Sequence, residues 1–236
     1  MSREAWIHEV FASLQGEGIY CGQSHTFVRF AGCNLACAYC DTPQSREPKP
    51  ASCRISGSES TSNPISVDEV VAQCRRLGRR TVALTGGEPL LQVSFLADLM
   101  PALRGAGLLN YLETNGTLYE DLARVAKHAD CIAMDVKLPS ATGQGEQWDA
   151  HARFLEIASS KEVFVKAVVT ASAPDDEVRR CAELIGGVDR RIALVLQPAA
   201  GNLPTGDRLS ELQSIALELL DDVRVIPQCH KLLGVP

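Results

Sequence analysis

Apolar segments typical of buried strands alternate with helical segments along most of the sequence after residue 65. Nearly continuous apolar strands separated by helices are typical of a parallel sheet that helices cover. The residues alone leave an incomplete barrel and a doubly wound sheet open. We predict an α/β fold, an incomplete TIM-like barrel of about six βα units with an extra C-terminal strand. The predicted strands are 25–32, 80–86, 108–116, 131–137, 162–170, 191–198 and 223–228, and the predicted helices are 66–77, 90–104, 118–128, 148–159, 174–185 and 207–220.

The chain has 236 residues, of which 45% are hydrophobic, so it can bury a sizeable core. We therefore expect a single domain over residues 1–236. Residues 43–64 are rich in serine and proline and lack an apolar period, which predicts an inserted surface loop that is mobile or partly ordered. Ser66 and Glu69 have the spacing of a capping box and predict a helix start.

Charge and the distribution of apolar residues argue against some classes of partner and location. The charge of −6 is the reverse of the basic face that nucleic-acid-binding domains usually carry. No apolar run approaches the roughly 18 residues that a membrane span needs. The first ten residues carry charges where a signal peptide would be apolar, so we expect a cytoplasmic protein that binds neither nucleic acid nor membrane.

Three of the nine cysteines, Cys33, Cys37 and Cys40, lie within the stretch "CNLACAYCDT". A structural zinc site usually has a second pair of ligands, and none follows here. A thioredoxin-like pair leaves Cys33 unexplained. Three thiolates without a fourth favour a four-iron, four-sulfur cluster with one open iron. Among the other cysteines, Cys74, Cys131 and Cys181 are expected in the core, and Cys21, Cys53 and Cys229 are isolated.

The Cys-x3-Cys-x2-Cys spacing resembles that of the radical S-adenosylmethionine (SAM) superfamily, in which the open iron binds the methionine moiety of SAM. Tyr39 matches the aromatic residue of that motif, and "TGGEP" (85–89) resembles the segment that holds the methionine amino group, with Gly87 and Glu88 as its key residues. Both motifs follow predicted strands. In a barrel-like fold the reactive face lies at the carboxyl ends of the strands, so we expect the two motifs to meet there.

The stretch "EVFASLQGEGIYCGQSHTFVRFAGCNLACAYCDT" is similar to the 7-carboxy-7-deazaguanine synthase family, as are "LETNGT", "MDVKLPS", "LVLQPAAGN" and "VRVIPQCHKLLGVP". The resemblance implies reductive cleavage of SAM and a radical ring contraction of 6-carboxy-5,6,7,8-tetrahydropterin, with loss of ammonia. It also implies a magnesium ion on Thr42, because an oxygen ligand suits that cation. Segment 43–64 has no counterpart in the resemblance.

The resemblance further assigns residues to three roles. Contacts to the substrate are implied for Leu14, Gln15, Gly16, Glu17, Arg29, Thr85, His230 and Pro236, the last through its terminal carboxylate. Contacts to SAM are implied for Tyr39, Gly87, Glu88, Asp135, Val136, Lys137, Gln197, Pro198, Ala199 and Ala200. Glu113 is grouped with the cysteines as catalytic, and Asn115 is expected near it. Arg29 suits a bidentate contact with the substrate carboxylate, since its neighbours Val28 and Phe30 point to the other face of their strand.

Two other readings stay open from the sequence. A glycyl-radical-enzyme activase has the same cysteine spacing but acts on a protein partner. A non-enzymatic zinc or iron–sulfur module would contain the metal without turnover. The family resemblance also implies a flavodoxin or ferredoxin as electron donor, and a homodimer.

Overall fold

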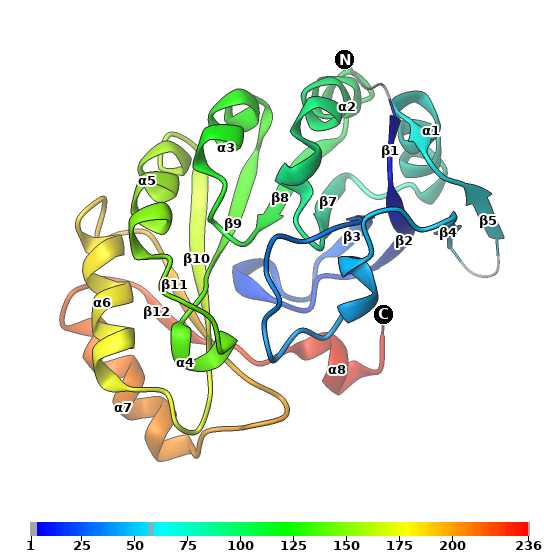
Figure 1. Cartoon of the computed structure of the whole chain (residues 1–236). Coiled ribbons are helices and arrows are strands. Elements are labelled where there is room, and N and C mark those ends of the chain that lie inside the picture. The colour runs from blue at the N-terminus through cyan, green and yellow to red at the C-terminus, as the bar shows by residue number, and fades with distance from the viewer. Residues whose placement is uncertain (1–3, 57–58, 236) are drawn as a thin grey trace.

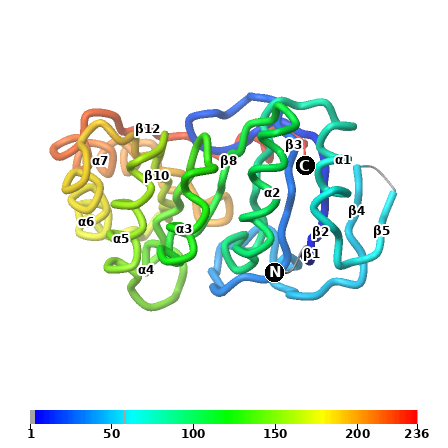
Figure 2. Tube along the Cα trace, turned by 90° about the horizontal axis from the view of Figure 1, so that it is seen from above, coloured from blue at the N-terminus to red at the C-terminus, as the bar shows by residue number. Residues whose placement is uncertain are grey.

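The computed structural model describes residues 4–56 and 59–235. Its centre is a ten-stranded sheet in which neighbouring strands from β3 to β12 are parallel. The sheet curves without closing, and its edges, β5 and β12, lie on opposite sides of the molecule (Figures 1 and 2). The predicted incomplete barrel is thus confirmed. Its parallel strands are β3 (Ser24–Phe30), β7 (Thr81–Gly86), β8 (Leu109–Thr114), β9 (Cys131–Val136), β10 (Glu162–Val169), β11 (Leu194–Pro198) and β12 (Val223–Val225).

The predicted helices form between these strands and cover the outer side of the sheet (Figure 1). Ser66 and Glu69 form the predicted capping box at the start of α1. The helices are α1 (Val67–Leu77), α2 (Val93–Gly105), α3 (Tyr119–Val125), α5 (Trp148–Ala158), α6 (Asp175–Gly186) and α7 (Gly206–Leu217); shorter ones are α4 (Pro139–Thr142), α8 (Cys229–Leu233), η1 (Gly18–Tyr20), η2 (Pro43–Arg46), η3 (Pro89–Gln92) and η4 (Ala126–His128). In the described part of the chain, none of these helices has the length and apolar character needed to cross a membrane.

The core has two parts because successive residues of a strand point to opposite faces. Phe30 of β3 packs with Phe95 and other helix residues in the main core. Phe27 of the same strand belongs to a smaller cluster with Tyr111 and Phe164 on the other face. These three aromatic side chains also line the cavity described below. Cys74, Cys131 and Cys181 are buried, as predicted.

The sheet begins earlier than the sequence suggested. Strand β2 (Ile7–Leu14) precedes the predicted first strand and pairs with β3 in the antiparallel direction. The two-residue strands β1 (Glu4–Ala5) and β6 (Ile65–Ser66) pair beside it. Strand β2 was not predicted, because apolar and polar residues do not follow a clear period in it: Glu9, Phe11 and Leu14 line the cavity, whereas Ile7 and Val10 are buried in the core.

Segment 43–64, expected as a surface loop, instead contains η2 and two strands, β4 (Ser52–Ile55) and β5 (Glu59–Ser62). Strand β4 pairs with β2, so this segment extends the sheet. Cys53 and Ile55 of β4 are buried, while Ser52 and Arg54 are exposed. This alternation is typical of a strand with one face on the core and one in solvent. Four residues are too few for that period to stand out among serines and prolines.

Candidate active site

A cavity of about 1090 Å³ opens at the carboxyl ends of the parallel strands. Segments that follow β2, β3, β7, β9 and β11 contribute to its wall, as does α8. Most of the predicted residues meet there, namely Leu14, Gln15, Gly16, Glu17, Arg29, Cys33, Cys37, Tyr39, Cys40, Thr42, Thr85, Gly87, Glu113, Asn115, Asp135, Lys137, Gln197, Ala199, Ala200 and His230. The side chains of Glu88, Val136 and Pro198 are buried outside this lining. Pro236 lies outside the described residues.

Hydrogen bonds from several elements hold the backbone of the cysteine loop. Arg46 Nη2 donates to the Cys37 carbonyl oxygen at 2.7 Å. The Ala38 N–H donates to Thr142 O at 3.0 Å, and the Gly32 N–H donates to Ser45 O at 2.8 Å. The loop therefore has a fixed course between η2 and α4, and its three thiols face one cavity.

The thiols suit an iron–sulfur cluster better than a single zinc ion. Among the described residues, the group of ligating side chains whose atoms all lie within 4.8 Å is Glu17, Asp41 and His230, so the three cysteine sulfurs are more widely spaced than that. None of the other six cysteines lines the cavity. Burial raises the pKa of the Cys33 and Cys37 thiols, so in the absence of metal they are neutral, and metal binding would release their protons.

The "TGGEP" segment supports the cysteine loop through its backbone. The Gly87 N–H donates to Phe30 O at 3.1 Å, and the Glu88 N–H donates to Gly32 O at 2.8 Å. A Cβ atom at residue 87 would lie 2.0 Å from the Gly32 carbonyl oxygen, so only glycine permits this approach. The close contact of Gly87 is thus with the loop that carries the cysteines.

Glu88, expected to contact SAM, is turned away from the cavity. Its carboxylate accepts hydrogen bonds from the Leu90 N–H at 3.0 Å, the Thr114 hydroxyl at 2.9 Å and the Asn115 N–H at 2.8 Å. Burial raises its pKa to about 7, against the lowering effect of these donors. Its side chain joins the ends of β7 and β8, so its role in the described structure is to fix that junction.

Polar side chains from the turn after β2 and from β8 are connected by hydrogen bonds on one wall of the cavity. Gln15 Nε2 donates to Glu113 Oε1 at 2.7 Å, and Gln15 Oε1 accepts from the Glu17 N–H at 3.1 Å. Burial raises the pKa of Glu113, although a hydrogen bond with Thr85 acts in the opposite direction. The arrangement presents an amide and a carboxyl group side by side, which suits the donor and acceptor edge of a heterocycle.

Glu17 is ionised within the same wall. Burial opposes its charge, but the Lys166 ammonium and a hydrogen bond from Gln228 lower its pKa to about 2. Gln228 Nε2 lies 2.7 Å from Glu17 Oε1, and Gln197 Nε2 lies 3.2 Å from the same oxygen. Lys166 also lies 3.4 Å from Asp135 Oδ2.

The part of the cavity next to Tyr39 contains a second ion pair. Lys137 Nζ lies 2.7 Å from Asp135 Oδ2 and 3.2 Å from the Tyr39 hydroxyl. The Asp135 carboxylate outweighs the effect of burial and raises the pKa of Lys137. Lys137 is therefore charged and fixed beside the aromatic residue of the cysteine motif.

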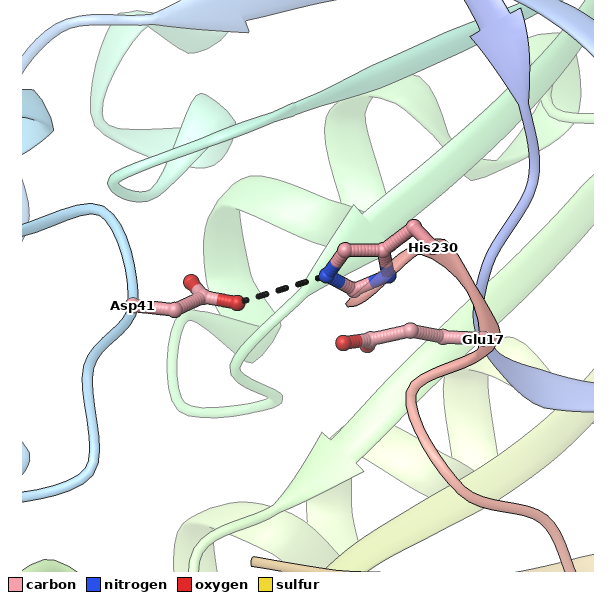
Figure 3. A group of neighbouring side chains, drawn as sticks. All are labelled: Glu17, Asp41 and His230. Carbon is pink, nitrogen blue, oxygen red and sulfur yellow. Dashed lines mark ion pairs between the residues drawn. The ribbon is translucent and has the colours of Figure 1, made fainter. Parts of the chain in front are cut away.

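Glu17, Asp41 and His230 come from three separate segments and point toward one another (Figure 3). His230 Nε2 lies 3.9 Å from Asp41 Oδ2, which also accepts a hydrogen bond from Gln228 at 3.1 Å. The Thr42 hydroxyl lies 3.2 Å from Asp41 Oδ1. Asp41 and Thr42 thus place a carboxylate and a hydroxyl oxygen together on the cavity wall.

Helix α8 is attached to the turn after β2. The Cys229 N–H donates to Gly16 O at 2.9 Å. Cys21 lies near Cys229, and burial, followed by the influence of the Cys229 thiol, raises the pKa of Cys21 to about 11. Cysteines that are isolated in the sequence are therefore neighbours in the fold.

Sequence reasoning missed several cavity residues, including Glu9, Arg46, Arg54 and Lys166. Lys166 carried a usable signal, because it interrupts the otherwise apolar segment "VFVKAVV" and its side chain leaves the core. Glu9 and Arg54 carried none, since the strands that place them were not predicted.

Comparison with known proteins agrees with this geometry. The family model of the radical SAM superfamily matches residues 27–185, which include the cysteine loop and the "TGGEP" segment. The partial barrel and its three-cysteine loop thus define a radical SAM protein. This class contains a four-iron, four-sulfur cluster and SAM, and the thiols described above fit such a cluster.

The relatives narrow the class. The chain is 41% identical to the 7-carboxy-7-deazaguanine synthase of Geobacter sulfurreducens, over 98% of this chain and 97% of the relative. It is 39% identical to the synthase of Methanopyrus kandleri, over 96% of this chain and 92% of the relative. The crystal structure of QueE from Escherichia coli matches with a TM-score of 0.69 and 26% identity, covering 96% of this chain and 95% of that one. The chain belongs to the 7-carboxy-7-deazaguanine synthase family.

Proposed function

We propose that this chain catalyses the radical conversion of 6-carboxy-5,6,7,8-tetrahydropterin to 7-carboxy-7-deazaguanine with loss of ammonia, a step toward queuosine-type bases. The observation that carries the proposal is one cavity that joins the cysteine loop to the Gln15–Glu113 wall. The relatives named as this synthase extend over almost the whole chain. They do not favour an activase of glycyl-radical enzymes.

Each wall has a task in this proposal. When bound, the cluster and SAM supply the radical chemistry. Tyr39, Asp135 and Lys137 bind and orient SAM, and Gly87 keeps the cysteine loop in place. Gln15, Glu17 and Glu113 accept the N–H groups of the pterin, and Arg29 binds its carboxylate. Gln197, Ala199 and Ala200 complete the SAM side, while His230 covers the pterin side.

Magnesium is part of the proposal, with Thr42 as its ligand. Support comes from the Thr42 hydroxyl and the Asp41 carboxylate, which lie together on the cavity wall. Magnesium prefers oxygen ligands, and both side chains offer one. Its other coordination positions would be left for substrate and water. Glu17 is a weaker candidate for a magnesium ligand, because the Lys166 ammonium already neutralises its carboxylate.

We further propose a single domain, a cytoplasmic location, a homodimer, and a flavodoxin or ferredoxin as electron donor, on the support of the family resemblance. Light scattering would determine the oligomeric state. The decisive experiment is anaerobic turnover of the carboxytetrahydropterin with SAM, a reductant and magnesium. Formation of the deazaguanine, followed by absorbance and mass, is the expected result. Cleavage of SAM without pterin conversion would contradict the proposal.

A further inference from the structure

Three charged side chains stand in one row across adjacent strands. Glu9 of β2 is the register partner of Arg29 on β3 and of Arg54 on β4. Register partners point to the same face of a sheet, and all three side chains line the cavity. We call Arg29, Glu9 and Arg54 the Arg–Glu–Arg row.

Glu9 joins the two arginines through separate oxygen atoms. Its Oε1 atom lies 2.7 Å from Arg29 Nε, and its Oε2 atom lies 2.5 Å from Arg54 Nη2. The side chains of Glu9 and Arg29 are each 17% exposed, whereas that of Arg54 is 66% exposed. The Arg29 guanidinium also lies over the Phe11 ring, 5.6 Å from its centroid. Arg29 is therefore fixed by an ion pair on one edge and an aromatic ring on one face.

This arrangement leaves one edge of Arg29 for a ligand. A guanidinium has five N–H donors in a planar fork, and the bond to Glu9 uses the one on Nε. Within the described residues, the two Nη groups of Arg29 have no hydrogen-bond partner. Two parallel N–H groups match a carboxylate, which Arg29 can bind without reorganisation.

Arg54 decides the charge of the row. Glu9 and Arg29 alone would form a neutral pair, which attracts an anion weakly. With Arg54 the row has two positive charges and one negative charge, so it carries a net charge of about +1 on the cavity wall. Arg54 comes from segment 43–64, for which the family resemblance offered no counterpart.

We infer that Glu9 and Arg54 are positioning residues that orient and charge Arg29, and that the row selects a carboxylate-bearing pterin over an uncarboxylated one. The inference rests on the proposed function. Strand β4 then has a role in substrate specificity. Glu9 neutralises one arginine of the row, and Arg54 of β4 supplies the positive charge that remains.

Arg54→Gln tests the charge and Glu9→Ala tests the positioning, with Arg76→Gln as the matched control. Arg76 pairs with Glu59 of the same hairpin but lies outside the cavity. Steady-state kinetics would give KM and kcat for the carboxytetrahydropterin. Equilibrium binding to the cluster-loaded protein with SAM would give Kd for this pterin and for 6-methyltetrahydropterin, which lacks the carboxylate.

For Arg54→Gln we expect about tenfold higher KM and Kd for the carboxylated pterin, because the row becomes neutral. Glu9→Ala raises the net charge of the row to about +2, so a loss of similar size in that variant would come from the lost positioning of Arg29 and not from charge. In both variants kcat and the Kd for the methyl pterin should change less than about twofold. Glu9→Gln keeps an acceptor for Arg29 and should restore most of the affinity lost in Glu9→Ala. Arg76→Gln should match the unaltered protein. Equal losses for the two pterins, or no loss in Arg54→Gln, would overturn the inference. An unaltered protein that binds neither pterin would instead overturn the proposed function.

Discussion

Gly16 lies directly against the His230 side chain, and a Cβ atom at residue 16 would lie 2.2 Å from His230 Nδ1. The turn that presents Gln15 and Glu17 is thereby locked to α8. The two segments are far apart in the sequence but form one wall.

Gly16→Ala should therefore displace His230 and α8 rather than perturb the cysteine loop. Overpacking of this kind costs about 1–3 kcal/mol, so we expect KM for the pterin to rise about tenfold or more. The iron content and the affinity for SAM should be unchanged. Gly145→Ala is the control, because a Cβ atom there meets nothing within 4 Å. An unaltered KM in Gly16→Ala would show that His230 does not contribute to substrate binding.

Loss of any one cluster cysteine should abolish both the iron–sulfur chromophore and turnover, since the three thiols are the cysteine side chains that the cavity offers to a cluster. Visible absorption, iron analysis and SAM cleavage would be measured for alanine variants of Cys33, Cys37 and Cys40. Cys74→Ala removes a buried thiol from the main core and should retain the chromophore. SAM cleavage by Cys37→Ala would refute the three-cysteine assignment.

Removal of magnesium should lower turnover much more than SAM binding, because the ion is proposed to touch the substrate and Thr42. Thr42→Ala should be slower and should respond less to added magnesium. Thr61→Ala, on β5 outside the cavity, should behave like the unaltered protein. Full activity after treatment with EDTA would exclude magnesium from the reaction.

Glu88 should make folding stability depend on pH. Its ordinary pKa of 4.5 applies to the unfolded chain, and burial raises the folded value to about 7. Between these values the folded state binds more protons, so the free energy of unfolding should fall as pH rises, by at most about 1.4 kcal/mol per unit. Urea unfolding of the cluster-loaded protein from pH 5 to 8 would measure the slope. Glu88→Gln cannot titrate and should lack this part of the slope; an equal slope would mean that its three donors keep Glu88 ionised.

The sequence was sufficient to predict the parallel strands of the sheet, but it was insufficient to predict the strands beyond β3 at one edge. Strands such as β9 and β11 are apolar except for Asp135 and Gln197, which line the cavity, and this nearly continuous apolar pattern is visible in one sequence. Strand β4 buries Cys53 and Ile55 alone, so its pattern is too short to recognise. Glu9, Arg54 and the contact between Cys21 and Cys229 depend on pairing between distant segments, which composition and spacing do not encode.

Motif resemblance located the site but not the direction of every side chain. Glu88 lies in the "TGGEP" motif, yet its carboxylate bonds to Leu90, Thr114 and Asn115 behind the cavity wall. A motif constrains the order of residues along the chain. The burial of a particular carboxylate depends on the donors that the next strand provides.

The attachment of α8 to the turn after β2 has a consequence for biosynthesis. The ribosome makes the Gln15 side of the pocket early, and the His230 side follows only after β12. The cysteine loop and its supports, Ser45, Arg46 and Thr142, are all complete before that point. A nascent chain can thus present its metal-binding loop through an open pocket, and the wall that Gly16 and His230 form together is completed only when α8 has been made.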